Sequence, residues 1–132
     1  MLLLVLLMLQ IHNLLAFLLG IAPQILTVPA IMAGNTVFVL LYLIVGAKVA
    51  SVARRIIAWL VAAAAKFVTL YVIVVKIICG VMAESLMAAG TLKAPMLKAL
   101  PATFSWPQLI TALIGGGVAL LIVPAIRKAL KR

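Results

Sequence analysis

The sequence predicts an all-α protein: a polytopic membrane helix bundle with four transmembrane helices in a single domain, residues 1–132. The first reason is composition, because 69% of the residues are hydrophobic, 9% are charged, and the mean hydropathy is +1.46. A soluble chain of this size buries only about 60–70% of its surface, too little to hide so much apolar area. The second is a series of apolar runs of roughly 20 residues, the length that crosses a bilayer. The third is that most basic residues lie at the ends of those runs.

Four spans follow one another along the chain, and glycines mark their ends. Gly20, Gly46 and Gly80 end the first three, because glycine is a weak helix former. Residues 80–105 are predicted to form a longer connection, in which residues 81–89 form a short helix at the membrane surface. The four predicted spans are roughly residues 2–20, 25–45, 56–79 and 106–126.

A cleaved signal peptide is the alternative interpretation of the first span. The apolar run begins at Met1 without a basic segment, and it continues past Gln10, His12 and Asn13 without a small-residue cleavage site. We therefore expect this span to be retained. The start of the chain inside an apolar run also suggests that further sequence precedes it.

Charge predicts the orientation of the spans. Eleven Lys and Arg residues against the single acid Glu84 give a net charge of +10. In a soluble protein this balance would suggest a nucleic-acid partner, but here the bases flank the spans and contact anionic headgroups. Segments 46–55 and 127–132 hold seven of them, against two in 20–24 and 80–105 together. The positive-inside rule thus predicts a multi-pass plasma-membrane protein with both termini in the cytoplasm and 80–105 outside.

Catalysis finds no support in the sequence. A single carboxylate cannot form an acid–base pair. One cysteine, one histidine and one acid are also too few for a metal centre. No glycine-rich phosphate loop follows a predicted strand. We therefore expect no enzymatic activity, no metal and no cofactor, and we interpret Cys79 as a small packing residue.

Uncharged polar side chains recur at one depth of the predicted bundle. With a rise of ~1.5 Å per residue, all four spans place such groups in the outer half of the bilayer. Isolated interhelical hydrogen bonds, worth about 0.6 kcal/mol each, are the alternative. Clustering at one depth favours a pocket open to the outside. The predicted substrate-binding residues are Asn13, Asn35, Lys66, Thr69, Gln108 and Thr111.

Lys66 is the most informative of these residues. It lies about midway along the third span, where an exposed charge costs at least ~2.5–3.5 kcal/mol. Its spacing from Thr69, Ile73 and Lys76 places all four on one helix face, which we expect to face the bundle. Snorkelling to the cytoplasmic headgroups is the alternative, but these lie about three turns away. An anionic ligand would be the simplest counter-charge, although a carbonyl group or water would also serve.

Small and aromatic residues predict how the helices pack. Residues 115–117, with Ala112 and Ala119, have the small-residue spacing of close helix contacts, as do Ala58 and Ala62. Packing is the expected role of both groups. Trp59 and Trp106 fit the inner and outer interfacial aromatic belts.

Three segments of the chain share a pattern with a known family. They are LLAFLLGI at 14–21 continuing to PAIMAGN at 29–35, AKFVTLY at 65–71, and FSWPQLITALIGG at 104–116. Together they resemble the substrate-binding (S) components of energy-coupling factor (ECF) transporters. Members of that family usually have six spans, and the four predicted here look like the last four. The helix that docks the coupling subunit has no counterpart in this chain.

The resemblance implies the membrane subunit of an ECF-type uptake transporter for a vitamin or similar micronutrient. Such a subunit captures a small molecule from the external side and pairs with a transmembrane coupling protein and two ATPase subunits. By position, Asn35, Lys66, Gln108 and the 80–105 connection are candidates for substrate contact. The alternative is a small oligomerising membrane protein, holin-like or a scaffold, without transport activity. A proton- or ion-coupled carrier is disfavoured because the spans contain no carboxylate.

Overall fold

The computed structural model describes residues 7–8, 11–12, 14–15, 18–19, 25–46 and 51–130. Every regular element in this part of the chain is a helix, and it contains no strand, which confirms the all-α prediction. Three helical runs there are long and apolar enough to cross a membrane. They overlap the second, third and fourth predicted spans, and the last begins at Ala94, 12 residues before the predicted start at 106; they are Thr27–Gly46, Val52–Val81 and Ala94–Leu130.

The first predicted span, residues 2–20, falls largely outside the described residues. Within it, the amide of Leu19 donates a hydrogen bond of 2.9 Å to the carbonyl of Leu15, the spacing of an α-helical turn. Asn13, one of the predicted site residues, lies outside the described part of the chain. The prediction of four spans therefore stays a prediction at its N-terminal end.

The 80–105 connection is more ordered than the sequence suggested. A short helix of six residues, Ala83–Ala88, is present within the expected range 81–89. A second helix, which was not predicted from the sequence, follows it within the connection. Pro95 lies in the first turn of that helix, where its missing N–H would have no partner anyway, and Pro101 lies inside it. The helices are α2 (Thr27–Gly46), α3 (Val52–Leu70), the π-helix η1 (Tyr71–Val81), α4 (Ala83–Ala88), α5 (Ala94–Thr103) and α6 (Trp106–Leu130).

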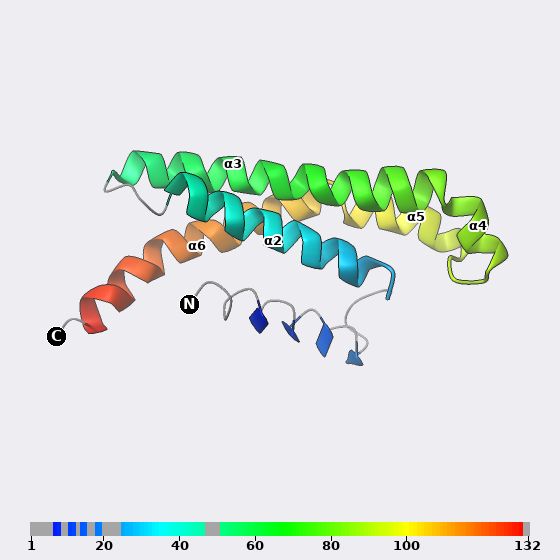
Figure 1. Cartoon of the computed structure of the whole chain (residues 1–132), viewed down its shortest axis with the longest axis horizontal. Helices are drawn as coiled ribbons and strands as arrows, with labels where there is room; N and C mark the ends of the chain where they lie inside the picture. Colours follow the sequence, from blue (N-terminus) through cyan, green and yellow to red (C-terminus); the bar gives the residue numbers. More distant parts are fainter. Residues whose placement is uncertain are drawn as a thin grey trace.

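Helix α3 is the central element, and η1 prolongs it into one long rod (Figure 1). Helices α2 and α6 both pack against α3, while α5 packs against η1. Helix α2 runs antiparallel to α3. A Cβ on Gly34 would lie 2.9 Å from the Leu70 side chain, and one on Gly46 would lie 3.0 Å from the Cβ of Ala58. The two helices therefore touch along much of their length because small residues allow it.

Buried residues recur along one side of the rod from Ala58 to Ile78, with the half-buried Lys66 among them. They recur every four residues, the spacing of a single helix face. Alanines form the part next to the C-terminal end of α2, where Gly46 approaches Ala58, and larger side chains form the part beneath α5. The buried members are Ala58, Ala62, Leu70, Val74 and Ile78.

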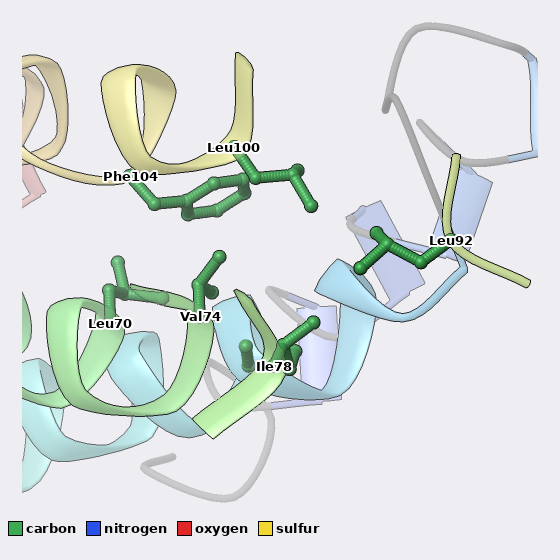
Figure 2. Close-up of a cluster of buried hydrophobic side chains, with 7 residues drawn as sticks. Leu70, Val74, Ile78, Leu92, Leu100 and Phe104 are labelled. Atoms are coloured by element: carbon green, nitrogen blue, oxygen red, sulfur yellow. The ribbon is translucent and has the colours of Figure 1, made fainter. Parts of the chain in front are cut away.

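The largest buried cluster lies where α5 returns over η1. Figure 2 shows Phe104 and Leu100, from the end of α5, directed toward Leu70 and Val74 on the rod. Leu92, from the turn before α5, joins the same cluster. This core holds the α4–α5 connection against the rod and fixes the position at which α6 begins.

Candidate functional site

Lys66 belongs to the buried face of α3. It lies four residues from both Ala62 and Leu70, each of which is fully buried, and is itself half-buried. The chain's only acidic residue, Glu84, is exposed in α4, 18 residues further along. Within the described part of the chain, Lys66 therefore has no carboxylate within reach. The structure thus places a half-buried lysine between two buried apolar residues of one helix, without an acidic counter-charge among the described residues.

Two of the predicted polar residues lie near the level of Lys66. Asn35 follows Gly34, which contacts Leu70 one helical turn from Lys66. Gln108 lies in the first turn of α6, whose Trp106 ring packs 5.9 Å from the ring of Phe67. Both side chains are half-buried. Asn35, Lys66 and Gln108 thus come from three helices at a similar height along the bundle.

The two predicted threonines direct their hydroxyl groups to their own helices. The Thr69 hydroxyl donates to the carbonyl of Ala65 at 2.8 Å, and that of Thr111 donates to the carbonyl of Gln108 at 3.1 Å. Thr111 is also exposed. Such bonds are local alternatives to contact with a ligand. Their oxygens retain lone pairs, so the threonines keep only an accepting role toward a ligand.

The face predicted for Lys66, Thr69, Ile73 and Lys76 is only partly inside the bundle. Thr69 and Ile73 are half-buried, but Lys76 is exposed. The Lys76 Nζ atom lies 5.8 Å from the centre of the Tyr71 ring. This distance is that of a cation–π contact. Lys66 is therefore the one lysine of this face that the helices enclose.

Trp59 packs against α6, while its place in the inner interfacial belt stays a prediction. Its indole Nε1 donates to the carbonyl of Ala112 at 3.4 Å, and a Cβ built on Gly116 would overlap its Nε1 and Cδ1 atoms. The ring therefore packs on the glycine surface of α6. Trp106, by contrast, is 69% exposed, as expected for an interfacial tryptophan.

A cavity of about 210 Å³ lies between α2, α3 and α6, near the C-terminal end of α2. None of the predicted site residues that the structure describes lines it. The sequence offered one signal for this site, Arg55 and Trp59 one turn apart at the start of α3. The residues that define its shape and charge are Phe38, Tyr42, Arg55, Trp59, Gly116 and Pro124.

Among the described residues, no group of three or more His, Cys, Asp and Glu side chains is placed to hold a metal ion. Comparison of the chain with models of protein families, with curated proteins and with solved structures finds no match. The function must therefore be inferred from the chemistry of these side chains.

Proposed function

We propose that this chain is a membrane-embedded binding subunit that captures a small anionic molecule beside Lys66. The observation that supports the proposal most directly is the position of Lys66 on the buried face of α3. A lysine in the middle of a span costs at least ~2.5–3.5 kcal/mol, so a lysine at this depth is by default a candidate for a functional role. A carboxylate or phosphate group on a ligand would offset that cost, because the chain itself offers only the distant Glu84.

Asn35 and Gln108 fit this proposal as neutral partners. Each amide can donate and accept hydrogen bonds, and each lies at a height similar to that of Lys66. By the positive-inside rule this level belongs to the outer half of the membrane, so the ligand would enter from outside. The resemblance to ECF S components makes a vitamin or similar micronutrient the proposed substrate. A coupling protein and ATPase subunits would then be the proposed partners.

Replacing Lys66 by methionine tests the proposal, because methionine keeps most of the side-chain volume and removes the charge. We expect the affinity for the ligand to fall at least about tenfold, the effect of losing one charge-assisted hydrogen bond. Ligands would first be found by thermal-shift screening of vitamins and small organic anions on the detergent-purified chain. Isothermal titration calorimetry would then compare the variants.

Lys76→Met is the matched control, because Lys76 is on the same helical rod but exposed. It should leave the affinity within about twofold, as expected for an exposed charge. Asn35→Ala should weaken binding as Lys66→Met does, though by less. A well-folded sample that no small anion stabilises, or a Lys66→Met variant that binds as tightly as the parent chain, would contradict the proposal.

A small oligomerising membrane protein is the second candidate, and helix α6 favours it. In the most apolar stretch of the helical run Ala94–Leu130, which contains α6, only 6% of the residues are buried within the chain. A Cβ on Gly115 would meet no atom within 4 Å, and Ala119, four residues on, is exposed. Exposed small residues at this spacing suit a helix–helix contact between copies of the chain. Light scattering that reports an oligomer, together with dye leakage from vesicles, would favour this function.

A further inference from the structure

The cavity between α2, α3 and α6 lies away from the Lys66 site. Arg55, in its wall, precedes Lys66 by 11 residues, or roughly 16 Å along α3. We propose that this cavity is a lipid site, in which part of an acyl chain of an anionic phospholipid packs against Trp59 while the lipid phosphate binds Arg55. This inference is independent of the proposed function, because it uses different residues and a different ligand.

The shape and the walls of the cavity suit an acyl chain. Phe38 and Tyr42 of α2 and Trp59 of α3 supply aromatic surfaces, and Gly116 leaves space beside the indole. The volume of about 210 Å³ is below the ~300–1,000 Å³ of sites that enclose a small molecule. It therefore accommodates a segment of a longer molecule, and the rest of that molecule would lie outside the cavity along the helices.

Helix α6 explains why the cavity is accessible from the bilayer. Figure 1 shows α6 diverging from α3 toward the C-terminal end, where it contains Pro124. Pro124 and Ala119 line the cavity and are exposed. A lipid chain could therefore enter sideways between helices, a route that suits a hydrocarbon tail and not a water-soluble anion.

The charge of the cavity wall selects the headgroup. Arg55 is the one charged residue among the described lining residues, and none of them is acidic. A guanidinium group binds phosphate through two parallel hydrogen bonds, and it stays charged at any physiological pH. In the proposed orientation this end of the bundle faces the cytoplasm, and the cytoplasmic leaflet is the one rich in anionic lipid.

Trp59 provides a direct reporter, because an indole in contact with a brominated acyl chain loses its fluorescence. The chain contains two tryptophans. A Trp106→Phe background leaves Trp59 as the only one. This full-length variant would be titrated in detergent micelles with phosphatidylglycerol or phosphatidylcholine, each with the same brominated chains. We expect half-maximal quenching of Trp59 at a fraction of phosphatidylglycerol that is about tenfold lower than the fraction of phosphatidylcholine needed.

Variants of two neighbouring arginines distinguish lipid binding at a defined site from the general attraction of anionic lipid to a basic surface. Arg55→Gln should reduce the tenfold preference to about twofold or less. Arg54→Gln should preserve it, because Arg54 is exposed and does not line the cavity. The difference should persist at 1 M salt, since partly buried charge pairs are screened less than exposed ones. Equal losses for the two variants, or equal quenching by the two lipids in the parent background, would overturn the proposal.

A second variant covers the case in which Arg55→Gln fails to fold, as judged by circular dichroism. Ala119→Phe places a ring in the lining from an exposed position of α6. It should reduce quenching of Trp59 by the anionic lipid at least about threefold by occupying the chain site, while helical content stays unchanged. Undiminished quenching in a folded Ala119→Phe protein would show that the acyl chain does not use this cavity.

Discussion

Replacing Phe104 by alanine should lower the free energy of unfolding by about 3–5 kcal/mol, the usual cost of removing a buried aromatic ring. Phe104 is 1% exposed and lies between α5 and the rod, against Leu70 and Val74. Its loss would leave a cavity where α5 turns into α6. We expect α5 to separate from η1 before the transmembrane helices do. Urea unfolding followed by circular dichroism, with limited proteolysis of residues 82–103, would measure both effects.

Ile110→Ala is the control for this prediction. Ile110 lies six residues further on in α6 and is 53% exposed, so its truncation leaves no internal cavity. Its effect should stay below about 1 kcal/mol. Phe104→Leu should fall between the two, because leucine fills part of the ring's volume. Equal stabilities of the Phe104→Ala and Ile110→Ala proteins would show that this cluster does not hold α5.

Gly116→Ala should destabilise the contact between α3 and α6 by about 1–3 kcal/mol, the range for overpacking a close contact. The added methyl group would overlap the Nε1 and Cδ1 atoms of Trp59. The indole would have to move, and its hydrogen bond to the carbonyl of Ala112 would be lost. We expect a lower melting temperature in detergent and a red-shifted Trp59 emission, measured in a Trp106→Phe background.

Gly115→Ala is the matched control, one residue away in the same helix. A Cβ on Gly115 meets nothing within 4 Å, so the substitution adds no contact within the described chain. Alanine is a better helix former than glycine by about 0.8–1.0 kcal/mol, so this variant should be as stable as the parent chain or slightly more stable. A melting temperature that falls equally for both variants would disprove the close contact at Gly116.

The sequence was sufficient for the features that depend on composition and spacing. Apolar length predicted the helices at 25–45, 56–79 and 106–126. The small residues Ala58 and Gly116 make the close contacts expected of them, and Ala62 is fully buried. Lys66 was located from its place in the middle of an apolar run. The sequence signals for these features are local, because each is a pattern of residues within a single helix.

The features that the sequence did not predict depend on where helices from distant parts of the chain meet. Pro95 suits the start of helix α5, and the helix continues through Pro101 because its apolar side packs on the rod, where tertiary burial outweighs the cost of an internal proline. The packing of Trp59 could not be predicted because it depends on where α6 lies beside α3. The cavity has walls from three helices, so no single segment contains its pattern.

The length of the rod has a consequence for the solvents that stabilise this protein. The rod Val52–Val81 has 30 residues, about ten more than the ~20 that cross a bilayer's hydrocarbon core. With Lys66 near the midplane, the surplus lies at both ends, and the last turn of η1 would reach beyond the lipid. The packing of Ile78 with Leu92 would then be held together by the exclusion of water, and the alanine and glycine contacts of α3 by close packing in lipid. We therefore expect denaturants to weaken the η1 end of this molecule, and the thickness of the bilayer to govern the stability of the α3 end.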